Sequence, residues 1–194
     1  MSTARSNASE FALTGLRMRA EDFFALGETH EAYELINGVV LMSPSPRPRH
    51  AKAIQELLKQ LGRFEDAGGQ ADVYSEIDVQ INDLAVFRPD ICVYANKTPE
   101  RIPERLTAPP DLVVEVLSPG SETLDLITKR DEYELRGVKE YWVIDPSTGR
   151  VRAWRLERGR FIEALVEGDA LISTAIKGFV LNVAKVKKAI GAAG

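Results

Sequence analysis

Two carboxylates occupy runs that otherwise have the composition of buried β-strands. Asp90 lies in the run RPDICVY, and Glu115 lies in PPDLVVEVLSPGS. Runs rich in Val and Ile and bounded by Pro, Gly or Ser are typical of short buried strands. A charge inside such a strand is costly unless it is paired, protonated or bound to a cation. Two of them in one small chain favour a divalent metal ion.

Such an ion would suit phosphoryl chemistry. Mg²⁺ binds carboxylate oxygens at about 2.1 Å and keeps several waters and a substrate phosphate, so two carboxylates and a backbone carbonyl suffice. It polarises a phosphoryl oxygen and lowers the pKa of a bound water. Simpler interpretations stay open: Glu115 pairs with a neighbouring Lys or Arg, and Asp90 has a capping or turn role after Pro89.

Lys129 is the candidate cation for the attacked phosphate. Glu115 precedes the turn at Ser121 by a strand length of about 10 Å, and Lys129 follows it by a helix length of about 12 Å. A helix that packs back along the strand therefore brings the two to a similar level. Arg130 flanks the same helix stripe, so the choice between these cations stays open, as does an ordinary surface lysine.

The elements that must position these residues follow from periodicity and turn signals. Asn37-Gly38 predicts a type I′ hairpin turn between strands at 32–36 and 39–43. Helices are expected at 20–27, 49–67 and from Ser121, which can cap it, to about Arg136. Further strands are expected at 71–81, 89–95, 111–118, 139–145 and 151–157, followed by short strands in FIEALVE and FVLNV and a final helical turn. The pattern predicts a mixed sheet flanked by helices.

Composition bounds the class of protein. A chain of 194 residues with 44% hydrophobic residues predicts one domain, here 16–194, preceded by a flexible arm at 1–15. A net charge of −4 argues against a wholly basic nucleic-acid binder but allows a local basic groove. The single cysteine, Cys92, excludes an internal disulfide. No apolar run reaches the roughly 18 residues that cross a bilayer, so a cytoplasmic protein without membrane contact is expected.

Four segments together resemble a known family. YELINGVV, RPDICV, VVEVLSPGS and GVKEYWVIDP, between about Tyr33 and Trp154, are similar to the Uma-two family of restriction endonucleases, in the PD-(D/E)XK or restriction-endonuclease-like superfamily. The resemblance implies an α/β (α+β mixed) restriction-endonuclease-like core, with a central mixed β-sheet flanked by helices and an N-terminal β-hairpin. It also implies a divalent-metal-dependent nuclease.

The resemblance carries residue roles with it. Asp90 matches the aspartate of the PD motif, and Glu115 matches the acidic residue of the second motif. The usual superfamily lysine position, two residues further on, is Leu117 here. This departure points to a lysine that has moved to the following helix, at Lys129. Glu34 matches an acidic residue of the first hairpin that faces the metal in the family.

The expected reaction is hydrolysis of a DNA phosphodiester. Asp90 and Glu115, with the Val116 carbonyl, would hold Mg²⁺ or Mn²⁺, and Lys129 would stabilise charge on the attacked phosphate. Glu34 would bind a second ion or a bridging water. DNA contacts are expected from the basic cluster before the first long helix, namely Arg47, Arg49, His50 and Lys52. A homodimer that cuts both strands is expected.

Two alternatives remain open at this point. Leu117 in place of lysine leaves room for a degenerate member of the fold, which binds nucleic acid or a protein partner without cleavage. A Glu115–Lys129 ion pair could also serve stability alone, in a protein whose role is assembly. Metal binding separates the first alternative from the nuclease, and the effect of Glu115→Gln on melting and activity separates the second.

Overall fold

A six-stranded sheet forms the centre of the protein. The computed structural model describes residues 13–29, 31–95, 103–166 and 168–192. Strand order in the sheet is β10-β9-β8-β7-β6-β3, where β7 and β8 run parallel and the other neighbouring pairs run antiparallel. Its strands are β3 (Ala71–Ser75), β6 (Ile91–Ala95), β7 (Leu112–Val116), β8 (Glu140–Asp145), β9 (Arg150–Glu157) and β10 (Arg160–Ala164). The predicted mixed α/β fold is confirmed.

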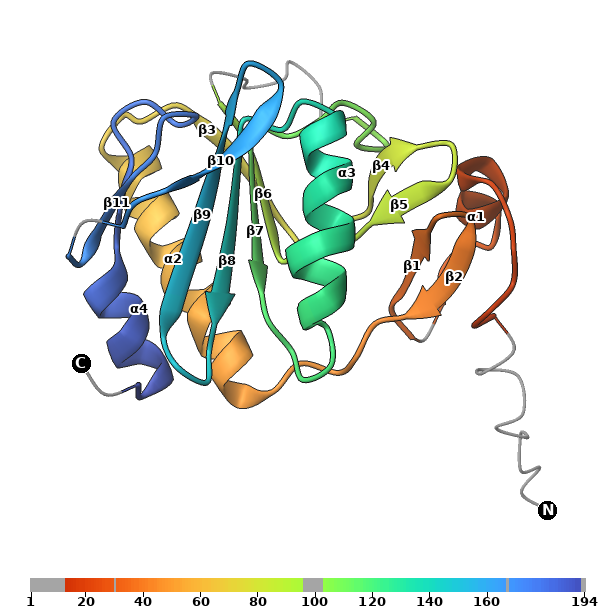
Figure 1. Ribbon diagram of the computed structural model, residues 1–194, viewed down its shortest axis with the longest axis horizontal. Coiled ribbons are helices and arrows are strands. Elements are labelled where there is room, and N and C mark those ends of the chain that lie inside the picture. Colours follow the sequence, from red (N-terminus) through yellow and green to blue (C-terminus); the bar gives the residue numbers. More distant parts are fainter. Residues whose placement is uncertain (1–12, 30, 96–102, 167, 193–194) are drawn as a thin grey trace.

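Helices cover both faces of this sheet (Figure 1). On one face α2 (Pro48–Asp66) and α4 (Val183–Ile190) pack on a cluster that includes Leu112, Val114 and Val116. On the other face a π-helical turn (Leu124–Lys129) continues into α3 (Arg130–Leu135) and packs over Val113. Because both faces are covered, all five residues of β7 are buried, Glu115 included. The predicted alternation of β7 side chains between the two faces is confirmed.

A second sheet carries the N-terminal hairpin. Its order is β2-β1-β5-β4, built from β1 (Tyr33–Ile36), β2 (Val39–Met42), β4 (Val79–Asn82) and β5 (Ala85–Phe87). The predicted type I′ turn is confirmed, since Asn37 and Gly38 both have positive φ, at 51° and 73°. The short helix α1 (Ala20–Ala25) packs on this sheet through Ala20 and Phe23. This sheet lies beside α3 in Figure 1.

The single strand predicted at 71–81 is wrong. The chain leaves the central sheet after Ser75, passes through Glu76 at a φ of 52°, and re-enters the second sheet as β4. A left-handed residue cannot continue a strand, so the alternating pattern on either side belongs to two sheets. The expected strand 89–95 begins only at Ile91, which leaves Asp90 just before it.

Smaller differences concern turns and the C-terminus. The Ser121 hydroxyl donates to the Ser118 carbonyl and accepts from the Ser118 N–H, so it closes the turn and does not cap the helix. Strands β5 and β11 (Ala170–Ile172) were not predicted, and the second pairs with β12 (Val180–Asn182). The final helical turn is α4, which spans eight residues.

Residues 1–12 of the expected flexible arm (1–15) and residues 96–102 of the loop at 96–110 fall outside the described residues. Where the chain is first described, the Gly15 N–H donates to the Val40 carbonyl at 2.8 Å, and Leu13 packs on the hairpin cluster. Within the described ranges no helix has the length and apolar composition to cross a membrane.

Candidate active site

Lys129 lies at the centre of a cluster of carboxylates. Its side chain is 5% exposed, and its Nζ is 2.9 Å from Glu34 Oε1 and 3.1 Å from Glu115 Oε1. A third carboxylate, Asp125, has Oδ1 at 3.5 Å. An ammonium group has three donors, and here each faces a different acid. Arg130, the other candidate, pairs instead with its neighbour Asp131 at 2.8 Å and is partly exposed.

The turn after β7 explains how Lys129 reaches Glu115. Gly120 has a φ of 90°, which reverses the chain at little steric cost. The chain then packs back along the sheet, and the π-helical turn ends at Lys129. One further turn along, the Tyr133 hydroxyl donates to Glu115 Oε1 at 3.3 Å. π-Helical turns are rare and occur frequently at functional sites.

Asp90 joins the cluster from the neighbouring strand. Strands β6 and β7 are antiparallel partners, so Asp90, just before β6, lies beside the end of β7. The Val116 N–H donates to Asp90 Oδ2 at 2.6 Å, and the Asp90 N–H makes a long contact of 3.4 Å with Glu115 Oε2. Both carboxylates line the same hollow of about 120 Å³. The two therefore lie on the same side of the sheet.

Glu34 reaches the same hollow from the other sheet. It lies on β1, is 5% exposed, and accepts the Arg88 N–H at 2.7 Å in addition to its contact with Lys129. The Ser43 hydroxyl is a further donor at 3.4 Å. Because β1 carries Glu34 and β7 carries Glu115, Lys129 joins the two sheets through a buried ion pair on each side.

His50 and the other members of the basic cluster separate in space. His50 is 6% exposed, with Nε2 3.3 Å from Asp90 Oδ2. In contrast, Arg47, just before α2, and Arg49 and Lys52, on its first turns, are exposed. His50 is therefore placed against a carboxylate and not on the outer surface. Its Nδ1 is buried and has no hydrogen-bond partner among the described residues.

The excess of acid shifts the ionisation of the cluster. Burial is the largest cause that raises the pKa of Glu115 well above its usual value; the charge of Lys129 lowers this pKa, and the charges of Asp125, Asp90 and Glu34 raise it. For Lys129, burial favours the neutral amine, but the three carboxylates prevail and raise its pKa. Burial by itself lowers the pKa of His50. The bond to Asp90 and the Asp90 charge act in the opposite direction, and the net effect is a raised pKa. Lys129 thus stays charged and Glu115 gains a proton readily.

Some members of the site were missed by the sequence interpretation. Asp125 is 4% exposed, and burial raises its pKa while Lys129 opposes that shift. Its spacing four residues before Lys129 was the available signal, since such pairs meet on one helix face. The Tyr133 hydroxyl and the Arg88 N–H gave no signal, because a phenol on a buried stripe and a backbone donor look structural in sequence.

A hard divalent cation fits this donor set. Within the described ranges no group of three or more His, Cys, Asp or Glu side chains is arranged to hold a metal. Asp90 and Glu115 nevertheless offer carboxylate oxygens beside the backbone of Val116, and Mg²⁺ is often bound through one or two carboxylates plus waters. The chemistry of the donors, with more negative charge than Lys129 alone neutralises, therefore suits such an ion.

Comparisons with known proteins identify the family and the fold. Residues 20–184 match the family model Uma2, which is described as "Putative restriction endonuclease". A crystal structure of a nuclease from Anabaena variabilis, titled as putative and as belonging to DUF820, is similar with a TM-score of 0.75. The two sequences are 21% identical, and the match covers 89% of this chain and 99% of that chain. No curated protein matches the chain.

Proposed function

We propose, since the chain belongs to the Uma2 family, whose description is "Putative restriction endonuclease", that it is a divalent-metal-dependent endonuclease that hydrolyses DNA phosphodiester bonds. One observation carries the proposal: a buried ammonium, Lys129, lies 3.1 Å from a strand carboxylate, Glu115, whose neighbour Asp90 lines the same hollow. A stability device would need one acid for one base. Here several acids surround a single lysine beside a hollow, and this excess of negative charge suits a site that binds a metal cation.

The residues divide the work as follows. Asp90 and Glu115, with the Val116 carbonyl, would hold Mg²⁺ or Mn²⁺. When bound, this ion would polarise the phosphoryl group and lower the pKa of a water. Lys129 places a fixed positive charge where the pentavalent phosphate gains negative charge, a form of preorganised stabilisation.

Glu34 and His50 act through their neighbours. Glu34 orients the Lys129 ammonium through the 2.9 Å contact. His50 holds Asp90 Oδ2 in its rotamer. Glu34 is also available to bind a second ion or a bridging water, as the family resemblance implies. Both are positioning residues in this scheme for the first ion.

DNA would approach across the start of α2. Arg47, Arg49 and Lys52 are exposed there, next to buried His50 at the hollow, so phosphate contacts from them suit a strand that passes the site. A homodimer would present two such sites to the two strands. Loss of these contacts would weaken binding and reduce its salt dependence.

Plasmid nicking tests the proposal. The purified protein should convert supercoiled DNA to the nicked form with Mg²⁺ or Mn²⁺ and not with EDTA. An Asp90→Asn/Glu115→Gln double variant should lose this activity, while an Asp131→Asn/Glu163→Gln variant, which removes two surface carboxylates, should keep it. Equal nicking by the site variant and the wild type would overturn the assignment, since a contaminating nuclease would then explain the activity.

Binding without cleavage is the second candidate function. It is favoured by the way Lys129 already satisfies Glu34, Glu115 and Asp125 within the protein, and by Leu117 at the usual lysine position. Calorimetry with Mn²⁺ separates the two candidates. A nuclease should give heat that the Asp90→Asn/Glu115→Gln variant lacks, whereas a binding-only protein should give none.

A further inference from the structure

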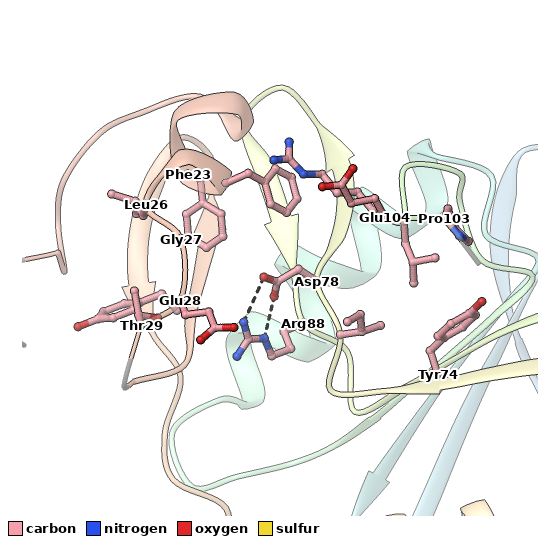
Figure 2. A pocket seen from close by; sticks show the side chains of 15 residues that line it. Phe23, Leu26, Gly27, Glu28, Thr29, Tyr74, Asp78, Arg88, Pro103 and Glu104 are labelled. Atoms are coloured by element: carbon pink, nitrogen blue, oxygen red, sulfur yellow. Dashed lines mark hydrogen bonds and ion pairs between the residues drawn. The ribbon is translucent and has the colours of Figure 1, made fainter. Parts of the chain in front are cut away.

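A second and much larger hollow lies beside the carboxylate cluster. Its volume is about 710 Å³, against about 120 Å³ for the hollow that holds Lys129. Pockets of about 300–1,000 Å³ are the size that receives a small organic ligand. Figure 2 shows side chains from α1 and from the loop after it, together with Asp78 just before β4 and Arg88 just after β5, around this space. We define it as the aromatic pocket, lined among others by Phe23, Phe24, Tyr33, Tyr74 and Arg105.

The aromatic pocket and the carboxylate cluster share their dividing wall. Arg88 lines both hollows: its N–H donates to Glu34, and its guanidinium is held by Asp78 at 2.7 Å (Figure 2). On β1, Glu34 faces the cluster and the preceding residue, Tyr33, lines the aromatic pocket. A chain whose phosphate lies at Lys129 could therefore place the adjoining group in the aromatic pocket.

The lining matches the chemistry of a nucleobase. The Arg105 guanidinium lies 4.5 Å from the centroid of the Phe24 ring, a stacked pair with a flat cationic face. Bases stack on aromatic rings and on arginine planes without regard to sequence. Glu28 and Glu104 add carboxylate acceptors with no ion pair or hydrogen bond to another described residue, and such groups accept from the N–H edge of a base.

The charge of the lining argues for the base and against a phosphate. Three carboxylates, from Glu28, Asp78 and Glu104, and two guanidinium groups, from Arg88 and Arg105, line the aromatic pocket. This excess of negative charge would repel the phosphodiester monoanion of a nucleic-acid backbone but leaves a neutral ring unaffected. Phosphate contacts are therefore left to Lys129, and the aromatic pocket is left to the ring attached to the neighbouring sugar.

We propose that the aromatic pocket receives an unpaired nucleobase of the substrate strand, next to the phosphate at Lys129, so that the protein favours single-stranded or locally opened nucleic acid. This inference rests on the proposed function for its substrate class. A paired base cannot enter such a pocket because its edge and both faces are occupied in the duplex.

Binding without metal tests the inference separately from cleavage. The full chain in EDTA is titrated into a labelled single-stranded DNA 12-mer and a fully paired duplex of the same sequence, with fluorescence anisotropy as the readout. The wild type should bind the single strand more tightly. Phe24→Leu should weaken that binding about tenfold, within the range measured for one stacked base, and leave duplex binding unchanged. Phe161→Leu, a partly buried phenylalanine outside the pocket, is the matched control.

A second variant covers the case in which Phe24→Leu fails to fold. Arg105 is exposed, so Arg105→Gln removes the cationic face with little risk to the fold and should also weaken single-strand binding. Titration of deoxyguanosine, a neutral nucleoside whose base presents two N–H groups on one edge, should shift amide resonances at residues 23–29 and 104–106.

The outcomes separate this inference from the nuclease proposal. Equal binding of single strand and duplex, or variants that bind as the wild type does, would overturn the base pocket even if plasmid nicking succeeds. Conversely, loss of single-strand affinity in Phe24→Leu and Arg105→Gln would support the pocket even if no nicking is found. Tighter binding of a single-stranded RNA 12-mer than of the DNA, with the same loss in both variants, supports the pocket and replaces DNA as the substrate.

Discussion

Two buried glutamates on neighbouring strands behave differently. Glu115 lies on β7 and Glu140 on β8, the parallel partner strand, and their exposures are 4% and 0%. Glu140 is surrounded by donors: Ser173 Oγ at 2.7 Å, and the Thr174 N–H and hydroxyl at 2.7 Å and 2.6 Å. Arg155 adds a guanidinium at 3.3 Å. Its charge is neutralised locally, and it ties the C-terminal segment to the sheet.

Glu115 has the opposite surroundings. It shares Lys129 with Glu34 and Asp125, and Asp90 lines the same hollow. A carboxylate in a buried strand is therefore not diagnostic by itself. The neighbouring groups distinguish the two. Glu115, the candidate metal ligand, lies among other acids beside a hollow, whereas Glu140, the structural residue, is surrounded by hydrogen-bond donors in a closed environment.

Removing the cation of the cluster should have the largest effect on stability. Lys129→Met leaves three buried carboxylates without a counterion, which should cost about 3–5 kcal/mol in the free energy of unfolding at neutral pH. Urea denaturation measures the loss. Lys187→Met, which breaks an exposed pair with Asp169, should cost no more than about 0.5 kcal/mol. A similar loss of stability in both variants would mean that Lys129 contributes no more to stability than a residue of an exposed ion pair.

Glu140→Gln should come next. The amide turns a donor toward Ser173, Thr174 and Arg155, so buried partners lose their acceptor at a cost of about 2–3 kcal/mol. Metal binding and nicking should be unchanged, because no atom of Glu140 lines the hollow. Glu163→Gln, in an exposed pair with Arg152, is the control. A loss of the heat of Mn²⁺ binding in Glu140→Gln would contradict the assignment of Glu140 as structural and Glu115 as a metal ligand.

At pH 4.5 Glu115→Gln should change the free energy of unfolding by less than about 1 kcal/mol, because it relieves crowding among acids while it weakens one ion pair. The stability difference between the variant and the wild type should change with pH in one direction. The folded pKa of Glu115 is raised, so its contribution is fully present below the unfolded value of 4.5 and is lost as pH rises through the folded pKa. The variant should therefore gain stability relative to the wild type between pH 4.5 and 8, as measured by melting in EDTA. A gap that shrinks as pH rises would contradict the raised pKa.

The smallest effect is expected for His50→Gln. The folded pKa of His50 is raised by Asp90, so its stabilising bond is fully present below pH 6.5 and fades as pH rises through the higher folded value. Melting of both proteins between pH 5.5 and 8.5, in EDTA, should show a wild-type advantage of about 0.5 kcal/mol at pH 5.5 that narrows as pH rises. A constant gap would mean that His50 contributes packing alone.

Local sequence signals predicted much of the fold. The hairpin at Asn37-Gly38, the long helix α2 and the alternation along β7 follow from turn chemistry and from periods of 3.6 and 2 residues, which depend on neighbours in the chain. The strand at 71–81 was wrong because periodicity continued through Glu76 while the backbone changed sheets. Strand β5 was missed because three residues, Ala85–Phe87, carry too short a pattern.

The sequence by itself determined that charges would be buried: Glu115 and, unnoticed, Glu140 stand in apolar strand runs whose burial follows from composition, and partly exposed Asp90 stands just before such a run. Only the tertiary structure decided which of them share a cation and which meet donors. The tertiary structure also places Lys129, and not Arg130, beside Glu115, and it brings Asp125 into the same cluster. It further places Arg88 between the aromatic pocket and the hollow that Glu34 lines. The physical reason is the sequence separation of the residues involved. Burial follows from the apolar content of neighbouring residues, whereas pairing depends on the strand order and on how a helix packs back on the sheet, which bring together residues far apart in the chain.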